Sequence, residues 1–271
     1  DAIEKMKGWQ ATLLSTCTTS IPGILEKILN RYLFRSSPGA RVEIAAWKAF
    51  RSFDLVFSVC GPLSLAKFRK KAKLVSWVFG MQNNSSRHSR HPYGKENLNS
   101  HAGFLCLTPN AQKDFSPFAK AEFIPWCVDL KLFDGQPPKE QPEHPFFLAT
   151  GKTGRDYHTL VEAAKSVKAE VKIIGPLNQR PPEAPQNVTW INSSTDPPDQ
   201  AIDYPTLRKW YSQCIAVCIP LSGDAEDTSG YTNLLEGMAM AKPVLMTKSG
   251  CLHLNPEERG LGTLIGPKDS E

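Results

Sequence analysis

Short apolar runs alternate with amphipathic segments along nearly the whole chain, and this alternation constrains the fold more than any other feature of the sequence. The runs are continuously apolar, which is typical of strands buried on both faces. Strands of this kind that alternate with helices form parallel sheets with helices on each side, so the sequence predicts an α/β fold. The expected strands are Ala11–Ser15, Leu55–Val59, Leu74–Phe79, Phe104–Thr108, Glu122–Trp126, Phe146–Thr150, Val171–Gly175, Val188–Ile191, Ile215–Leu221, Val244–Thr247 and Thr263–Ile265. The expected helices are Pro22–Phe34, Leu63–Lys71, Ala111–Ala119, Asp156–Val167, Pro205–Ser212 and Tyr231–Ala241.

A proline-rich polar segment interrupts this alternation at residues 134–145. It has neither a helical nor a strand period, so it predicts an interdomain linker. We therefore expect one Rossmann-like domain over residues 1–136, a linker over 137–145 and a second Rossmann-like domain over 146–271. Ligands of such sheets bind at the carboxyl ends of the strands, which predicts a ligand cleft between the two domains.

Charge is distributed unevenly between the two halves. Residues 1–140 hold 20 Lys and Arg against 11 Asp and Glu, a net +9, whereas the rest holds 12 against 16, a net −4. The excess peaks between Lys67 and Lys73. The simplest interpretation of this basic cluster is a solvated helix face, and the second is a surface that contacts an anionic membrane. Nucleic acid is not expected, because the cluster lacks the interleaved aromatic residues on which bases stack.

The composition also bears on location. No apolar run approaches the ~20 residues that a membrane-spanning helix needs. The seven cysteines are scattered, with no C-x-x-C pair and no zinc spacing, which is typical of free thiols in a reducing compartment. We therefore expect a cytoplasmic protein, with peripheral contact to an anionic membrane as an alternative location.

The segment Ser229–Val244 carries the strongest chemical signal. A small, flexible entry ending in Gly230 opens an apolar helix, and Pro243 ends it. A helix start with free backbone N–H groups is suited to a phosphate. Glu236, an acid between Leu235 and Gly237, is costly to bury without a partner, so either it lies at the helix edge or it binds a polar ligand such as a sugar hydroxyl. The combination predicts a nucleotide-sugar site.

A second signal lies in the expected strand-to-helix turn at Gly151–Asp156. Its glycines permit close backbone approach, and Lys152 and Arg155 supply the positive charge that a diphosphate leaving group requires. The spacing is not that of a Walker loop. A surface turn whose Arg155 pairs with a neighbouring acid is the alternative interpretation.

Taken together, three blocks resemble the GT-B glycosyltransferases of family 4, the retaining, nucleotide-sugar-dependent type. Ile124–Phe133 is similar to the family's IPxGVDxxxF, with Cys127 where glycine is usual; Gly151–Ala163 is similar to GRxxRDYxTLIEA; and Ser229–Val244 is similar to SGxTxLLEAMAMGKPV. Residues 187–191 occupy the place of the strand whose loop borders the nucleobase.

This resemblance implies two Rossmann-like domains that face a cleft, an acceptor-side domain first and a donor-binding domain second. It implies that Lys152 and Arg155 act as catalytic residues on the donor diphosphate, that Glu236 binds the ribose, and that neither a metal nor another cofactor takes part. The expected partners are a nucleotide-sugar donor and a glycan or lipid acceptor. The residues expected to bind the donor are Gly151, Ser229, Gly230, Tyr231, Thr232, Glu236 and Trp190.

The chain departs from the family pattern at several positions. Thr228 stands where the family has the first acid of its paired-glutamate motif, which removes the usual contact to the transferred sugar. Phe79 stands where a histidine is frequent, and His88, His91 and His101 are left as candidates for acceptor contact. The family's first strand with its glycine-rich loop and its terminal helices are not recognisable, so a chain trimmed at both ends is expected.

Three other functions remain open. A non-catalytic GT-B-like protein that binds a nucleotide sugar or a partner is favoured by Phe79, Thr228 and the short ends. A nucleotide-sugar epimerase on the same architecture would need further acid and base residues facing the donor, and the sequence does not place them. A dinucleotide oxidoreductase is the weakest alternative, because no Gly-x-Gly-x-x-Gly follows a strand.

Overall fold

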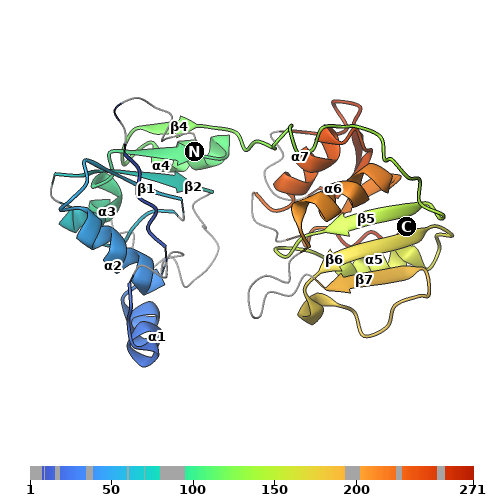
Figure 1. The fold of residues 1–271 in the computed structure, drawn as a ribbon, viewed down its shortest axis with the longest axis horizontal. Helices are drawn as coiled ribbons and strands as arrows, with labels where there is room; N and C mark the ends of the chain where they lie inside the picture. The colour runs from blue at the N-terminus through green and yellow to red at the C-terminus, as the bar shows by residue number, and fades with distance from the viewer. Residues whose placement is uncertain are drawn as a thin grey trace. The chain divides into compact units, whose positions relative to one another are not determined.

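The computed structural model describes residues 8, 10–15, 19–34, 39–59, 61–69, 71–79, 95–192, 202–223, 228–248 and 254–271. The chain divides into two compact units, Asp1–Pro125 and Trp126–Glu271, which Figure 1 shows in blue to green and in green to red. The first unit has a four-stranded sheet and the second a six-stranded sheet. Every strand pair in both sheets is parallel, so the predicted α/β fold with two parallel sheets is confirmed.

The first unit is built on the strand order β1-β2-β3-β4. Its strands are β1 (Leu55–Ser58), β2 (Lys73–Val78), β3 (Gly103–Cys106) and β4 (Ala121–Phe123). Its helices are α1 (Gly23–Tyr32), α2 (Gly39–Ala49), α3 (Lys95–Asn99) and α4 (Pro109–Phe115), with a 3₁₀ turn at Ala66–Phe68. Thr108 caps α4, because its hydroxyl accepts from the N–H of Ala111 at 3.0 Å.

Two expected elements of the first unit are absent. The expected strand Ala11–Ser15 is irregular, and Leu13 is 90% exposed there instead of being buried against a sheet. The expected helix Leu63–Lys71 shrinks to the 3₁₀ turn. The buried Glu43 carboxylate of α2 accepts from the N–H groups of Ser64 and Leu65 at 2.6 and 3.1 Å, and it thereby holds the start of that segment as a turn.

The second unit has the strand order β10-β9-β8-β5-β6-β7. Its strands are β5 (Phe146–Thr150), β6 (Glu170–Gly175), β7 (Val188–Asn192), β8 (Ala216–Ile219), β9 (Val244–Thr247) and β10 (Gly262–Ile265). Its helices are α5 (Tyr157–Ala164), α6 (Tyr204–Gln213) and α7 (Tyr231–Ala239), with a 3₁₀ turn at Leu177–Gln179.

The helices of the second unit cover opposite faces of its sheet. Residues of α6 and α7, such as Tyr211 and Leu234, pack with Leu148 and Val217 in one buried cluster. Tyr157 of α5 belongs to another cluster, on the face that Ala149 and Cys218 present. Figure 1 shows α6 and α7 together on one side of β5. Successive residues of β5 therefore serve two cores, which explains why the strand is continuously apolar.

Residues 126–145 pack on the second unit. Phe133 is 3% exposed and its ring meets that of Tyr211 edge-on, with the centroids 5.7 Å apart. Asp134 pairs with Arg208 of α6. Along the chain the first unit ends at Pro125, whereas the predicted first domain ends at residue 136 and the predicted linker spans 137–145; those boundaries remain a prediction.

None of the described helices combines the length and the apolar character that crossing a membrane requires.

Candidate functional site

The site is organised around the junction of β5 and β8. These strands are neighbours, but the chain leaves β5 toward β6 and leaves β8 toward β9. This reversal makes the carboxyl ends of β5 and β8 the topological switch point, where open α/β sheets bind their ligands. The loop Gly151–Asp156 follows β5, and the loop that opens α7 follows β8. The two segments singled out in the sequence therefore meet at one edge of the sheet.

Helix α7 starts without a side-chain cap. Gly230 is its N-cap residue, with a left-handed φ of 79°, and it offers no side chain to accept from the first turn. The N–H of Tyr231 donates to the carbonyl of Thr228 at 3.2 Å. Within the described ranges, the N–H groups of Thr232 and Asn233 have no acceptor. Of the predicted amides, that of Tyr231 is therefore engaged in a turn, whereas Thr232 and Asn233 offer donors to an anion.

Arg155 folds back over Gly151 towards α7. A Cβ at Gly151, whose φ is 128°, would lie 2.3 Å from a terminal nitrogen of the guanidinium, so only glycine permits this approach. The Arg155 Nε donates to the carbonyl of Thr150 at 3.1 Å, one terminal nitrogen to the carbonyl of Thr153 at 2.6 Å, and the other to Asn233 Oδ1 at 2.5 Å.

All three acceptors of Arg155 are uncharged. No carboxylate among the described residues lies within ion-pair distance of the guanidinium, so none of them is the acid that the alternative interpretation expects beside Arg155. Burial lowers the pKa of Arg155, because a desolvated cation without a counter-charge is costly. A bound anion would compensate that charge.

Lys152 and Trp190 have different environments. The Lys152 side chain is exposed on the same loop, and its carbonyl accepts from the Gln179 amide at 2.6 Å. Trp190 of β7 is half-buried; its indole N–H donates to the carbonyl of Gly175 at 3.1 Å, and its ring meets that of Tyr157 edge-on at 5.1 Å. Trp190 thus has a packing role. The loop expected to border a nucleobase, residues 193–201, lies outside the described residues.

Glu236 lies inside the unit rather than at the helix edge. It is 5% exposed, and its Oε2 accepts from the hydroxyl of Tyr211 at 2.8 Å. Burial raises the pKa of Glu236, and the hydrogen bonds from Tyr211 and Asn233 oppose that rise. Burial, followed by the nearby Glu236 charge, raises the pKa of Tyr211 well above its usual value, so Tyr211 remains a hydrogen-bond donor.

Three functional candidates escape the sequence reasoning: Thr150, Tyr211 and Asn233. Asn233 Nδ2 donates to Thr150 Oγ1 at 2.5 Å and to the Tyr211 hydroxyl at 3.3 Å. All three are at least nine-tenths buried. The sequence contains one signal for this group. Asn233 is a polar residue three positions before Glu236 on the same apolar helix, and residues three apart share a helix face, so Asn233 is expected near Glu236.

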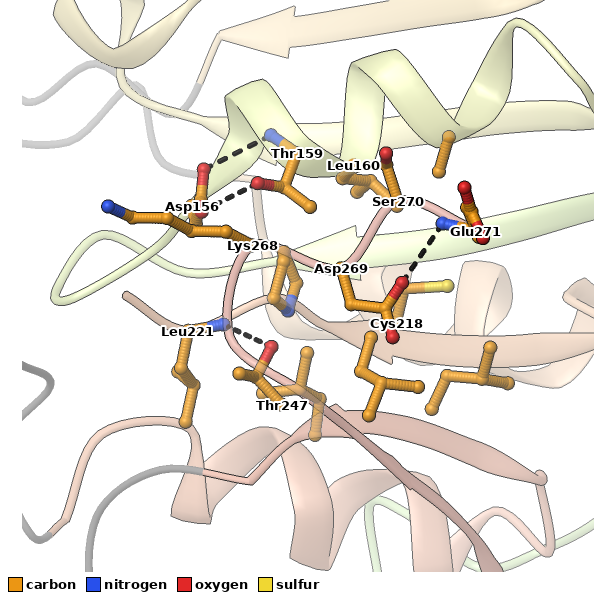
Figure 2. Close-up of a pocket in the computed structure, with 15 residues that line it drawn as sticks. Asp156, Thr159, Leu160, Cys218, Leu221, Thr247, Lys268, Asp269, Ser270 and Glu271 are labelled. Atoms are coloured by element: carbon orange, nitrogen blue, oxygen red, sulfur yellow. Dashed lines mark hydrogen bonds between the residues drawn. The ribbon is translucent and has the colours of Figure 1, made fainter. Parts of the chain in front are cut away.

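A small pocket on the α5 side does not suit a nucleotide sugar. Figure 2 shows Thr159, Cys218, Leu221 and Thr247 around it. Its volume is about 150 Å³, whereas pockets for ligands of this size usually span roughly 300–1,000 Å³. The Asp156 carboxylate is already engaged by Thr159, whose N–H and hydroxyl donate to it at 3.1 and 2.7 Å. We do not assign the donor to this pocket.

Of the acceptor-side candidates, His101 belongs to the described residues. His101 is 4% exposed; its Nδ1 lies 2.8 Å from the carbonyl of Asn97, and the N–H of Leu63 donates to Nε2 at 3.5 Å. Its ring stacks on Phe104 at 4.7 Å, so His101 is a structural residue and not an acceptor ligand. His88 and His91 lie outside the described residues.

Part of the basic cluster is engaged within the first unit. The Arg69 guanidinium donates to the carbonyls of Ser100 and Ala72. Lys67 pairs with Glu96 at 3.9 Å, whereas Lys71 and Lys73 are exposed. In the described chain, no three His, Cys, Asp or Glu residues are grouped to hold a metal ion.

Comparison with known proteins identifies the fold. No protein-family model matches the chain. No curated protein matches it either. A glycosyltransferase from Rickettsia africae ESF-5 aligns with a TM-score of 0.57 at 16% identity, over 92% of this chain and 75% of that one. Sucrose-phosphate synthase from Thermosynechococcus elongatus aligns with a TM-score of 0.55 at 16% identity, over 93% of this chain and 69% of that one. HepE from Anabaena, solved in complex with UDP-glucose, aligns with a TM-score of 0.56 at 14% identity, over 85% of this chain and 70% of that one. The chain therefore has the α/β fold of the GT-B glycosyltransferases.

Proposed function

We propose that this protein is a glycosyltransferase of the retaining, family 4 type, which moves a sugar from a nucleotide-diphosphate sugar to a hydroxyl of a glycan or lipid. One observation carries the proposal: Arg155, which has no carboxylate partner among the described residues, lies beside the N–H groups of Thr232 and Asn233, which have no acceptor among them either, at the switch point of the sheet. A diphosphate fits both features, because it accepts from guanidinium and backbone donors together.

The roles of the residues follow from the charge that develops in the reaction. The bond between the anomeric carbon and the diphosphate breaks, and the acceptor oxygen bonds to that carbon on the same face, while its proton passes to the departing phosphate oxygen. Arg155, Lys152 and the start of α7 stabilise the negative charge on the departing diphosphate. In this proposal they do so without a metal ion.

Glu236 is proposed to bind the ribose. Its Oε2 is occupied by Tyr211, so the ribose hydroxyls would donate to Oε1. A carboxylate accepts strong hydrogen bonds of this kind when it is ionised. Uridine diphosphate is the first donor nucleotide to test, because the HepE neighbour was solved with UDP-glucose.

Calorimetric titration with UDP, GDP and ADP tests the donor site. We expect Arg155→Ala to weaken binding of the best of these by about ten- to a hundredfold, because it removes charge-assisted hydrogen bonds to phosphate. Glu236→Ala is expected to weaken it through the ribose. Arg208→Ala is the matched control, since Arg208 is an arginine of the same unit whose partner is Asp134. Equal affinity for wild type and both site variants would refute the site.

A non-catalytic donor-binding protein is the second candidate, favoured by Thr228 in place of the first acid of the family motif. The two candidates differ in turnover. The test is incubation with radiolabelled UDP-glucose, or with the corresponding sugar donor of whichever nucleotide binds. An enzyme is expected to release the labelled sugar from its donor, whereas a binding protein is expected to leave the donor intact. Activity that persists in EDTA supports the metal-free mechanism, and anomeric analysis of the product tests retention.

A cytoplasmic location with peripheral membrane contact is proposed from the basic first half of the chain. Helix α1 adds exposed apolar side chains, Ile24, Leu25 and Ile28, beside Lys27 and Arg31. Such a helix is suited to an anionic bilayer surface. Cosedimentation with phosphatidylglycerol vesicles but not with phosphatidylcholine vesicles is expected, and equal recovery with both would contradict the proposal.

A further inference from the structure

We infer that Asn233 is a positioning residue that sets the Arg155 guanidinium for the donor diphosphate and, through Tyr211, the Glu236 carboxylate for the ribose. The inference rests on the proposed function. It assigns one buried amide the task of aligning the two halves of the donor site, which come from segments about 80 residues apart in the sequence: Arg155 from the loop after β5 and Glu236 from α7.

The contacts of Asn233 permit only one orientation of its amide. Oδ1 accepts from the Arg155 guanidinium, and Nδ2 donates to Thr150 Oγ1. If the amide were flipped, its NH₂ group would face a guanidinium, which has donors only. The side chain is 8% exposed, so water does not compete freely for these bonds. Arg155 is thereby fixed against the first turn of α7.

This arrangement leaves Arg155 with donors to spare. A guanidinium has five N–H groups, and three of them donate to Thr150, Thr153 and Asn233, so among the described residues two have no acceptor, one on each terminal nitrogen. A pair of this kind matches two oxygens of a phosphate. Because Asn233 is uncharged, it orients the cation without neutralising it. An aspartate at this position would form an ion pair and remove the charge that the diphosphate needs.

A second branch of the hydrogen-bond network leads to Glu236, the carboxylate that we propose for the ribose. Asn233 Nδ2 lies 3.3 Å from the Tyr211 hydroxyl, which in turn donates to Glu236 Oε2 at 2.8 Å. Tyr211 is fully buried between α6 and the sheet, so packing holds its hydroxyl between Asn233 and Glu236. Tyr211 thereby holds Oε2 of Glu236, and Oε1 is the oxygen that we propose for the ribose.

Pyrophosphate and UDP are the probes of choice, because pyrophosphate reports on the Arg155 arm alone. We expect Asn233→Ala to weaken pyrophosphate binding about tenfold or more, and Asn233→Asp to weaken it further. In an Arg155→Ala background, Asn233→Ala is expected to add less than about a twofold loss, because its effect passes through Arg155. Tyr211→Phe is expected to weaken UDP binding more than pyrophosphate binding, because Tyr211 contacts Glu236 directly and Arg155 only through Asn233.

The controls separate positioning from general destabilisation. Ser212→Ala removes a buried hydroxyl next to Tyr211 whose bond goes to the Lys209 carbonyl, and it is expected to change neither affinity. Thr150→Val retains the shape of the side chain but removes the acceptor of Asn233, so it provides a second test if Asn233→Ala does not fold. Its pyrophosphate affinity is expected to fall.

The outcomes distinguish this inference from the proposed function. Wild-type protein that binds neither pyrophosphate nor UDP, GDP or ADP would overturn the proposed function. If the wild type binds and folded Asn233→Ala has the same affinity, the role of Asn233 alone is overturned. If Asn233→Ala does not fold, unchanged affinity in Thr150→Val has the same meaning. The same holds if the losses from Arg155→Ala and Asn233→Ala simply add, since additive losses indicate independent structural effects.

Discussion

At the scale of single residues, the fold holds the imidazole of His101 in its neutral form. Burial lowers its pKa from 6.5 to about 4, against the opposing effect of the Asn97 carbonyl. The unfolded chain therefore takes up a proton at a higher pH than the folded chain does. As the pH falls, stability is lost between about 6.5 and 4, because protons bind preferentially to the unfolded state.

We expect this residue to account for a loss of about 2 kcal/mol in the free energy of unfolding between pH 7 and pH 5. Urea denaturation of wild type and of His101→Gln at both pH values measures it. The glutamine variant does not titrate in this range, so its loss is expected to be smaller by that amount. An identical loss in both proteins would show that folding does not shift the pKa of His101.

At this scale the sequence indicates some residues of the site and not others. It indicates Lys152, Arg155 and Glu236, because a charge in a glycine-rich turn or an acid in an apolar helix is unusual in itself. It does not indicate Tyr211 and Asn233, because a tyrosine or an asparagine in an amphipathic helix is ordinary until its partner is known. Only the contacts at 2.8 and 3.3 Å give these two residues a role.

At the scale of elements, the start of α7 depends on Gly230. A Cβ there would lie 2.7 Å from Ile219 Cγ2, and the φ of 79° is unfavourable for any other residue. We expect Gly230→Ala to destabilise the protein by about 2–4 kcal/mol, the sum of overpacking and backbone strain, and to weaken pyrophosphate binding by displacing the helix start. Thermal denaturation and calorimetry measure the two effects.

Gly260→Ala is the matched control for this change. Gly260 has a φ of 65° and open space around its Cβ position, so the substitution adds strain without a clash. Its loss of stability is expected to be smaller, about 1 kcal/mol, with pyrophosphate binding unchanged. Equal losses in both variants would mean that the close packing of α7 on β8 contributes nothing.

Element positions were predicted well where the local signal is strong. β5 and β9 have the predicted bounds, and α7 begins at the predicted residue. The error at Leu63–Lys71 has a tertiary cause, since the distant Glu43 carboxylate holds the segment's first N–H groups in a turn. Helix α2 was not predicted, although it supplies that carboxylate.

At the scale of the whole molecule, every predicted donor residue lies in the unit Trp126–Glu271. We expect residues 126–271, expressed alone, to fold and to bind pyrophosphate as the full chain does. Residues 146–271 are expected to be less stable by at least about 3 kcal/mol, because they lack Phe133, which packs on Tyr211. Thermal melts and titrations of both fragments measure this. Equal stability would place the boundary of the unit beyond Phe133.

The sequence by itself determined the class of the fold and the local character of the site: parallel strands from continuous apolar runs, a glycine-rich turn with two cations, and a helix that opens on glycine. Only the tertiary structure decided which side chains meet. β5 lies beside β8 and not beside β9, and this order brings Arg155 to Asn233 and Tyr211 to Glu236. Periodicity reports which face of an element is buried, whereas strand order is set by the packing of the whole sheet, and residues distant in the sequence find their partners only there.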